Sequence, residues 1–447
     1  MDIFKFQKEL FQKGKQYGFN DMEIFYTLNS STSIGVQKNT VKDYKIAETY
    51  GVSFRGIYMD KMGYSYVEKI SEESIDFLLK EAMENAKTIE VDDEEELFEG
   101  AEKYETVNKY SEALVKIPVQ ELIESAFKLE KAALEADSRI KQVLECSISR
   151  HIYESAIINT KGMNCYSKGC IVSAAVYVMA NDEMQTSTGF EYDFTLSDFS
   201  KLNFKNIAKK AVVEAVSKLW AESIQSGNYP VIFRHNTATE LFASFISSFS
   251  GENVEKGFSI LKGKLGQTIA GHNINVIEDP LMEDAPGAEG FDAEGYPTKR
   301  VLLVKNGKLL NFMHNRKTSK KAGTSSTGNA SKNGFNSTVT VGAHNVYLKP
   351  GDKGLEDIIK ETQDGLFIIE LHGTNAGINS VSGDFSLYAA GFLIEKGKLT
   401  HPVNQITVSG NIFKVMNNLD EIANDLIIKS SVTSPSVKVR SLSISGK

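Results

Sequence analysis

A cluster of acidic residues is the first feature of the chain that could do chemistry. Its members are Glu278, Asp279, Glu283, Asp284, Glu289, Asp292 and Glu294. Paired carboxylates can bind a hard cation or act as general acid and base. Prolines and glycines interleave with these residues, which is typical of an exposed loop. We therefore expect an exposed loop, and we keep Asp292 and Glu294 as candidate substrate-binding residues.

The histidines offer no local metal site. None of the seven is followed by glutamate, which excludes an HExxH zinc motif, and no two lie within five positions of each other. A helical two-histidine clamp needs ligands one turn apart. A site assembled from distant segments stays open, and so does an independent hydrolase that uses Asp292, Glu294 and a distant histidine.

Other local catalytic motifs are also missing. No two glycines are separated by a single residue, so a GxG dinucleotide fingerprint is excluded, and neither GxxxxGK nor GxSxG occurs. The cysteines are Cys146, Cys165 and Cys170, with no CxxC pair. An odd count gives no disulfide framework, so we expect buried, unreactive thiols.

Composition favours a soluble, two-domain cytoplasmic protein. A chain of 447 residues exceeds the size of one hydrophobic core, which stops growing near about 250–300 residues. A net charge of −8 argues against a direct nucleic-acid surface. The longest apolar run, residues 171–180, is about half the length of a membrane span and predicts a buried strand. The charged N-terminus does not resemble a signal peptide.

The N-terminal half alternates helical and strand patterns. Helices are predicted within residues 1–18, from Ser71, from Pro118 and over 201–224. Short strands are predicted near residues 23–28, 32–36 and 50–54, and several more between 138 and 195. The acidic run at residues 92–96 predicts a solvated linker. This half is expected to be an α+β domain that covers residues 1–226.

Residues 227–447 are expected to form a second domain dominated by antiparallel β-sheet with few helices. One helical pattern covers residues 237–249. Short strands and glycine-rich turns follow it, including an Asn306-Gly307 hairpin. Residues 322–342 are predicted to be a long loop. Together the two halves give an α+β fold.

Three blocks of the C-terminal half resemble the TldD/PmbA family. They are SGENVEKGFSILKGKLGQTI at residues 250–269, GFDAEGYPTKRVLLVKNGKLLNFMHNRKTSKKAGTSSTGNA at 290–330, and GINSVSGDFSLYAAGFLIEKGKLTHPVNQITVSGN at 377–411. The N-terminal half is similar to the family in size and in its order of strands and helices. The resemblance therefore covers nearly the full chain.

The resemblance also implies which type of family member this is. TldD-like chains hold zinc through an HExxxH motif and a cysteine near the C-terminus. Here Arg234 and Thr239 stand where the two histidines belong, His235 stands where the glutamate belongs, and residues 429–447 contain no cysteine. The chain is similar to the PmbA (TldE) type, so no catalytic and no metal-binding residue is expected in it.

The family's activity sets the expected partners. The resemblance implies the non-metal subunit of a cytosolic metallopeptidase that trims unfolded or precursor peptides. Its partner would be a TldD-like paralogue that carries the zinc, in a heterodimer. This chain would not be catalytic alone, and a homodimer in isolation stays open.

The older family description, modulator of DNA gyrase, supplies the alternative function. The chain would then be a regulatory factor that binds a topoisomerase or another protein, with no role in proteolysis. Because no basic groove is evident, it would act through protein contacts.

Two loops within the resembling blocks are candidates for substrate contact. They contain Thr327, Gly328 and Asn329 in the first, and Gly383, Asp384 and Ser386 in the second. The alternative is structural, because glycine supplies turns and Asn or Asp satisfies them.

Overall fold

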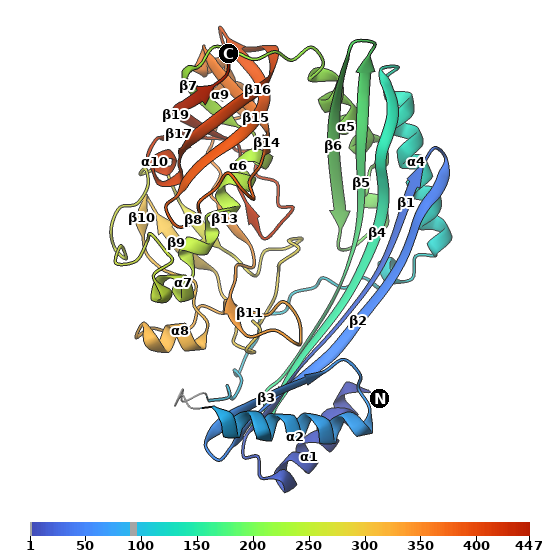
Figure 1. Ribbon diagram of the computed structural model, residues 1–447, viewed down its shortest axis with the longest axis vertical. Helices are drawn as coiled ribbons and strands as arrows, with labels where there is room; N and C mark the ends of the chain where they lie inside the picture. The colour runs from blue at the N-terminus through green and yellow to red at the C-terminus, as the bar shows by residue number, and fades with distance from the viewer. Residues whose placement is uncertain (1, 90–95) are drawn as a thin grey trace.

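The computed structural model describes residues 2–89 and 96–447, so residues 92–95 of the predicted linker lie outside the described part. One six-stranded antiparallel sheet organises the N-terminal half, in the order β3-β2-β1-β4-β5-β6 (Figure 1). Its strands are β1 (Met22–Gln37), β2 (Thr40–Tyr58), β3 (Lys61–Val67), β4 (Ile140–Asn159), β5 (Asn164–Asp182) and β6 (Gln185–Thr195). The prediction of short strands was wrong here, because residues 23–28 and 32–36 belong to the single strand β1.

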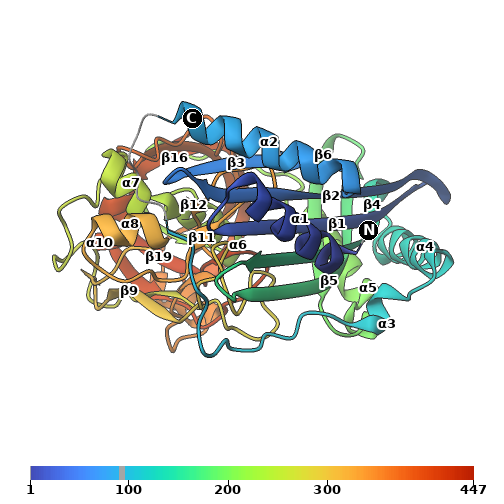
Figure 2. The same cartoon turned by 90° about the horizontal axis from the view of Figure 1, so that it is seen from below.

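Helices cover one face of this long sheet in two groups. The helices are α1 (Ile3–Tyr17), α2 (Glu72–Thr88), α3 (Glu112–Val115), α4 (Val119–Ala136) and α5 (Phe204–Ser217), with a 3-10 turn η1 (Phe199–Lys201). Figures 1 and 2 show α1 and α2 at one end of the sheet and α4 and α5 at the other. Side chains alternate along a strand, so Ile24 and Ile34 lie on this same face, in the α1–α2 and α4–α5 cores respectively.

The other face of the sheet turns toward the C-terminal half and is polar along the middle of β1, while Phe25 and Ile157 form an apolar cluster farther along. In β1 it presents Thr27, Asn29, Ser31 and Ser33, which are partly buried. The Lys332 ammonium donates to Ser53 Oγ of β2 at 3.2 Å, which fixes the direction of this face.

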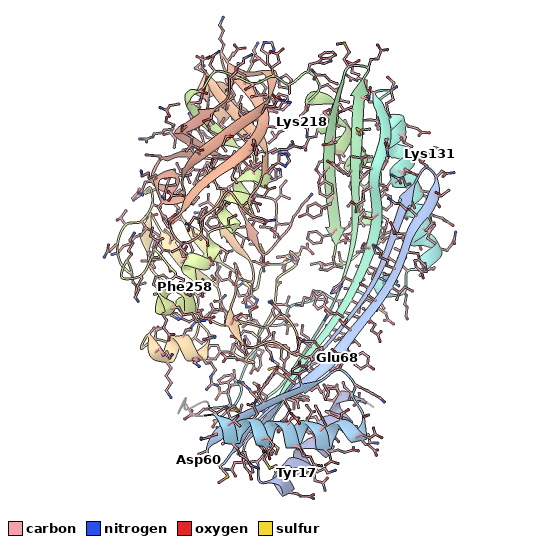
Figure 3. The ribbon with its side chains drawn as sticks, viewed as in Figure 1. Tyr17, Asp60, Glu68, Lys131, Lys218 and Phe258 are labelled. Atoms are coloured by element: carbon pink, nitrogen blue, oxygen red, sulfur yellow. The ribbon has the colours of Figure 1, made fainter. Side chains whose placement is uncertain are left out.

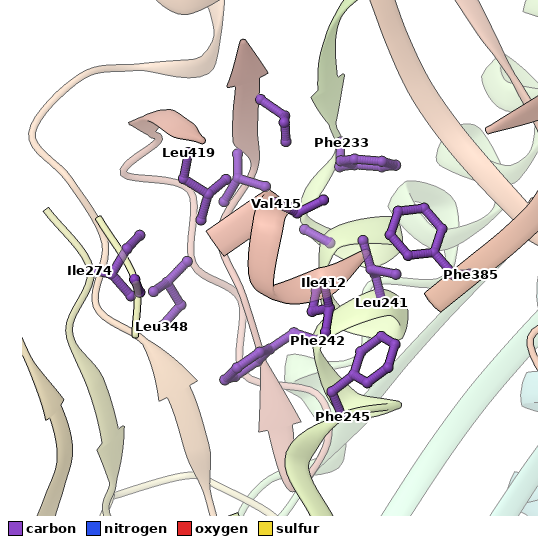
Figure 4. Close-up of a cluster of buried hydrophobic side chains, with 14 of the residues drawn as sticks. Phe233, Leu241, Phe242, Phe245, Ile274, Leu348, Phe385, Ile412, Val415 and Leu419 are labelled. Carbon is purple, nitrogen blue, oxygen red and sulfur yellow. The ribbon is translucent and has the colours of Figure 1, made fainter. Parts of the chain in front are cut away.

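A closed barrel forms the core of the C-terminal half. Its sheet has the order β16-β15-β14-β7-β19-β17, and an additional pairing of β16 with β19 closes the barrel. The strands are β7 (Gly227–Phe233), β14 (Gly365–His372), β15 (Asp384–Glu395), β16 (Lys398–Asn411), β17 (Leu419–Ile422) and β19 (Val437–Ser445). Closure leaves few backbone groups unpaired. Figure 4 shows Phe233, Leu241, Phe385 and Ile412 in its apolar core.

Shorter elements pack around the barrel. A second sheet has the order β10-β9-β8-β13-β18. Its strands are β8 (Val276–Glu278), β9 (Val301–Lys305), β10 (Lys308–Leu309), β13 (Val346–Leu348) and β18 (Val432–Thr433), and β11 (Ala330–Ser331) pairs with β12 (Thr340–Val341). The helices are α6 (His235–Ala243), η2 (Ile246–Phe249), α7 (Gly251–Lys256), α8 (Arg316–Lys321), α9 (Leu355–Thr362) and α10 (Ile412–Asn417).

The structure confirms the α+β class and the β-rich C-terminal half. The Asn306-Gly307 turn joins β9 to β10 as predicted. β7 begins at Gly227, where the domain boundary was expected. None of the helices in the described part of the chain is both long and apolar enough to cross a membrane.

A buried carboxylate holds the tip of the β1–β2 hairpin. Glu130 of α4 accepts hydrogen bonds from the Lys38 and Asn39 amides at 2.7 and 3.0 Å, and it is 3% exposed. We expect Glu130→Ala to lower the free energy of unfolding by about 1–3 kcal/mol, because two backbone donors lose their acceptor. Urea unfolding measures this. Glu135→Ala, an exposed change on the same helix, should have little effect. Equal effects of the two changes would contradict the anchoring role.

Candidate functional site

The start of α6 is the first candidate region, because it is where the resemblance would put a metal motif. Strand β7 leads directly into Arg234, which is the N-cap residue of α6. The Arg234 amide donates to Ile368 O of β14 at 2.9 Å, and the His235 amide donates to Ser436 Oγ at 2.9 Å. The end of β7 is therefore held on both sides, by β14 and by the segment before β19.

Arg234 reaches out of the barrel to the N-terminal half. Its guanidinium lies 2.7 Å from Glu214 of α5, and it donates to Ile369 O at 3.1 Å. Lys218, which follows α5, lies 3.9 Å from Glu214 and pairs closely with Glu370 of β14. Figure 3 places Lys218 between the two halves of the molecule. The four side chains form a chain of alternating charges, the Arg234–Glu370 network, that links α5 to the barrel.

The two other residues at positions of the expected metal motif, His235 and Thr239, are also held or shifted by their surroundings. Thr239 Oγ1 accepts from the Ser434 amide at 2.9 Å. Burial, and then the Arg234 charge, lowers the pKa of His235, which favours the neutral ring. Over the described ranges, no three His, Cys, Asp or Glu side chains come together as a group that could hold a metal ion.

The acidic cluster of residues 278–294 divides into two environments. Glu283 and Asp284 are exposed in a loop without regular structure, as predicted. The expectation of exposure was wrong for three members, because Glu278 is 0%, Asp292 2% and Glu294 6% exposed.

Backbone donors satisfy the buried carboxylate of Asp292. Its Oδ1 accepts from the Glu294 and Tyr296 amides, both at 2.9 Å, and its Oδ2 accepts from the Ala330 amide at 3.0 Å. Burial, and then the charge of Glu294, raises the pKa of Asp292 to about 7. Glu294 accepts from the Arg316 amide at 2.8 Å. Both carboxylates thus tie loops together.

Thr327, Gly328 and Asn329 join this buried group. Thr327 Oγ1 donates to Asn329 Oδ1 at 2.6 Å, and Asn329 Nδ2 donates to Glu278 Oε1 at 3.1 Å. Gly328 has φ of 76°, and an added Cβ there would lie 2.7 Å from Pro297 O. Glu278 also accepts from the His344 amide at 2.9 Å, and burial raises its pKa. The candidate loop is therefore internal in this structure.

Gly383, Asp384 and Ser386 lie elsewhere, at the turn that begins β15, where Asp384 and Ser386 are exposed and Gly383 is buried. Asp384 accepts from Asn411 Nδ2 at 2.9 Å and from Ser382 Oγ at 2.8 Å. The Ser386 and Ser409 hydroxyls are 3.0 Å apart across β15 and β16. The structure thus brings Asp292, Glu294, Thr327, Gly328 and Asn329 together, and it places the second loop at the end of the barrel.

A cavity of about 360 Å³ lies between η2–α7 and β12. Ser247, Ser250, Asn253 and Thr340 line it, and its charged residue, Glu252, pairs with Lys256 at 2.6 Å. Its lining does not bring an acid and a base to one point. The residues that line the cavity therefore do not form a catalytic acid–base pair.

Sequence reasoning missed the Arg234–Glu370 network. Its members are separated by up to about 150 positions and come from α5, the segment after it, the end of β7 and β14. No spacing between neighbouring residues in the sequence predicts this network. The one available signal was the arginine at the position where the resemblance expects a histidine.

The buried Asp292 predicts a pH effect on stability. The pKa of Asp292 is about 7 in the folded state and about 3.9 in the unfolded state. Between about pH 4 and pH 7 the folded state therefore carries more of this proton than the unfolded state does. The free energy of unfolding should therefore fall as pH rises from about 4 to 7, by at most about 1.4 kcal/mol per pH unit from this group.

Asp292→Asn should remove that contribution, and Asp384→Asn, at an exposed site, should keep it. Urea unfolding at several pH values measures the slopes. Parallel profiles for the wild-type chain and Asp292→Asn would show that the carboxyl does not titrate in this window.

Three family models together match most of the chain. The PmbA/TldA metallopeptidase domain 1 matches residues 22–86, the central domain matches 112–219, and the C-terminal domain matches 226–446. The metalloprotease PmbA homolog of Haemophilus influenzae is 30% identical over 343 residues, which are 74% of this chain and 71% of that protein.

Solved structures share the whole fold. A candidate modulator of a DNA gyrase from Thermotoga maritima superimposes with a TM-score of 0.92 and 29% identity, over 99% of this chain and 100% of that one. TldE from Thermococcus kodakarensis gives a TM-score of 0.90 at 24% identity, over 99% and 100% of the two chains. The three matched domains and the relative at 30% identity show that the chain belongs to the PmbA/TldD metallopeptidase family.

Proposed function

We propose that this chain is the non-metal subunit of a two-subunit peptidase, paired with a metal-bearing paralogue of the same family. The observation that carries the proposal is Arg234. It occupies the position expected for the first zinc ligand, and its guanidinium forms an ion pair with the Glu214 carboxylate at 2.7 Å. A guanidinium has no lone pair to give a metal and stays protonated.

The neighbouring residues do not fit zinc either. Thr239 already accepts a hydrogen bond from the Ser434 amide, and Ser436, in the same segment, donates to Asp425 Oδ2 at 2.6 Å. Residues 429–447 contain no cysteine that could complete a site. No catalytic step is therefore assigned to this region. In the paralogue, zinc would activate water for peptide hydrolysis.

The role left to this chain is to hold substrate. The face of the long sheet with Asn29, Ser31 and Ser33 carries small polar side chains, which suit the backbone of an extended peptide more than particular side chains. At the turn that begins β15, Asp384 and Ser386 are exposed and can contact peptide directly, whereas Gly383 is buried and would shape the turn. Asp292, Glu294, Thr327, Gly328 and Asn329 are buried and would act by shaping the loops between these surfaces.

We place the complex in the cytoplasm. Cys146, Cys165 and Cys170 are free and buried, which suits a reducing compartment. Burial raises the pKa of all three thiols, and the pKa of Cys146 reaches about 12, so they are poor nucleophiles.

Regulation of a topoisomerase is the second candidate function. It is favoured by the likeness to the Thermotoga maritima protein, which is described as a candidate modulator of a DNA gyrase. In that case the chain would bind its target protein without any peptidase activity. Capture of partners from cells distinguishes the two functions.

The test is to purify the chain alone and together with a metal-bearing paralogue, then measure bound zinc and cleavage of an unfolded peptide. We expect zinc and cleavage in the complex and neither in the isolated chain, because Arg234 and Thr239 cannot replace two histidines. The complex after removal of metal by a chelator is the matched control.

Zinc bound stoichiometrically by the isolated chain, or cleavage by it, would contradict the proposal. Recovery of a topoisomerase from cells, without any metal-bearing relative, would favour the regulatory function instead.

A further inference from the structure

The helix-bearing face of the long sheet has a stretch between its two helix groups that no helix covers. Figure 1 shows α1 and α2 at one end of this face and α4 and α5 at the other, with the middle of β1 and β2 between them. Leu28 of β1 lies in this stretch and pairs with Tyr50 of β2 and with Glu154 of β4. Because cross-strand partners share a face, Tyr50 and Glu154 stand on either side of Leu28.

Aromatic side chains gather around Leu28. Tyr26 and Tyr166 lie in the next row of residues across the sheet, on the same face. Phe4 of α1 extends the group, with its ring centroid 6.1 Å from that of Tyr166. Tyr50 is 38%, Tyr166 41% and Phe4 37% exposed, and large apolar side chains that are exposed together indicate a binding surface. The residues that we name the tyrosine–acid surface are Tyr26, Tyr50, Tyr166, Glu48 and Glu154.

The two carboxylates of the tyrosine–acid surface have no counter-charge. Neither Glu48 nor Glu154 forms an ion pair with any residue that the structure describes. Two cations of the same face point elsewhere. Lys168 pairs with Glu154 across the strands, but its Nζ lies 3.8 Å from the centroid of the Tyr110 ring, and Arg150 donates to two backbone carbonyls at and after the end of α3. The charge that complements this surface is therefore positive.

The hydroxyl of Tyr26 also lacks a partner. Tyr26 is 8% exposed, and its hydroxyl makes no hydrogen bond within the described ranges of the chain. Burial, and then the charge of Glu154, raises the pKa of Tyr26 to about 12, with smaller effects of Glu48 and Tyr50. The hydroxyl therefore lies among the groups of the tyrosine–acid surface. Buried tyrosine hydroxyls usually have a partner, and here an N–H donor of a bound cation would supply it.

We propose that the tyrosine–acid surface binds a basic side chain, lysine or arginine, of a partner polypeptide. The cation lies over Leu28, with the carboxylates of Glu154 and Glu48 as its counter-charges. The rings of Tyr26 and Tyr50 contribute cation–π attraction, and the Tyr26 hydroxyl accepts one N–H. This surface lies on the face of the sheet opposite to the one that turns toward the C-terminal half, so its binding role is separate from the proposed peptidase role.

The openness of the surface is the reason for choosing a polypeptide over a free amine. Sites for small molecules are concave and bury most of the ligand. Here Glu48, Tyr50 and Tyr166 are exposed, so no wall encloses a small cation. A basic side chain is held by its own chain, which can make further contacts along the uncovered stretch with residues such as Ser30 and Ile46, the latter 64% exposed.

Fluorescence anisotropy with a labelled peptide tests the binding. The probe is a twelve-residue peptide of alternating glycine and lysine, and the control probe has the same sequence with every lysine ε-acetylated. The lysine peptide should bind at least about tenfold more tightly, because acetylation removes the charge that Glu154 and Glu48 attract. Its affinity should fall as ionic strength rises.

Substitutions locate the binding on the surface. Glu154→Gln should weaken binding of the lysine peptide about tenfold, because a counter-charge is lost. Tyr50→Leu should weaken binding about threefold, whereas Tyr50→Phe, which keeps the ring, should leave it unchanged. Glu135→Gln, the same change of charge at an exposed residue of α4, is the matched control and should have no effect. Thermal melts show whether each variant folds, and Glu48→Gln replaces Glu154→Gln if the latter does not.

Three outcomes would overturn the proposal. Equal effects of Glu154→Gln and Glu135→Gln would show that the peptide responds only to the net charge of the chain. Equal affinity for the lysine peptide and its acetylated control would show that no cation is recognised. Tighter binding of spermidine than of the lysine peptide, lost in Glu154→Gln, would assign the surface to a free amine. The zinc and cleavage assays of the proposed function are independent of all three.

Discussion

The relative position of the two halves depends on the pairing of partly buried charges between α5 and the barrel. Arg234 and Glu370 project from the barrel, and Glu214 and Lys218 project from α5 and the segment that follows it. Their side chains are 7–25% exposed, so each charge needs a counter-charge nearby to offset lost hydration. Satisfying them requires the barrel to sit at this end of the long sheet.

A second contact joins the C-terminal half to the face of the long sheet that the helices leave uncovered, through a lysine and aromatic rings. Lys332 of the C-terminal half lies 4.3 Å from the centroid of the Phe25 ring. Burial lowers the pKa of Lys332 to about 8, with a further decrease from Arg55. Tyr64 OH donates to Phe335 O at 2.7 Å. Together with other contacts, such as Lys429 Nζ to Glu191 Oε1 at 2.6 Å, these contacts hold the C-terminal half against the long sheet.

Elements with local signals were predictable from sequence. Gly18 ends α1 in a left-handed conformation, Ser71 precedes α2, and Asn306-Gly307 forms a tight hairpin. Strand length was not predictable, because polar residues such as Ser30 and Ser31 look like turn residues in sequence. In the structure they continue β1 by pairing with both β2 and β4.

The candidate site was predictable only in part. Asp292 and Asn329 were chosen from separate loops, and a shared buried network brings them together. Their burial comes from contacts far apart in sequence, such as Tyr104 OH donating to Gly295 O at 2.9 Å. The partner of Arg234 could not be foreseen either, because Glu214 belongs to a helix of the other half.

The most direct test of the account is a double-mutant cycle on Arg234→Ala and Glu214→Ala, measured by urea unfolding. If the pair joins the two halves, its coupling energy should be about 1–3 kcal/mol. The exposed pair Arg139 and Asp137, 2.8 Å apart, is the matched control and should couple by less than about 1 kcal/mol. Additive effects of the Arg234 and Glu214 changes would show that Arg234 does not join the halves, and its side chain would then be free for another role at the start of α6.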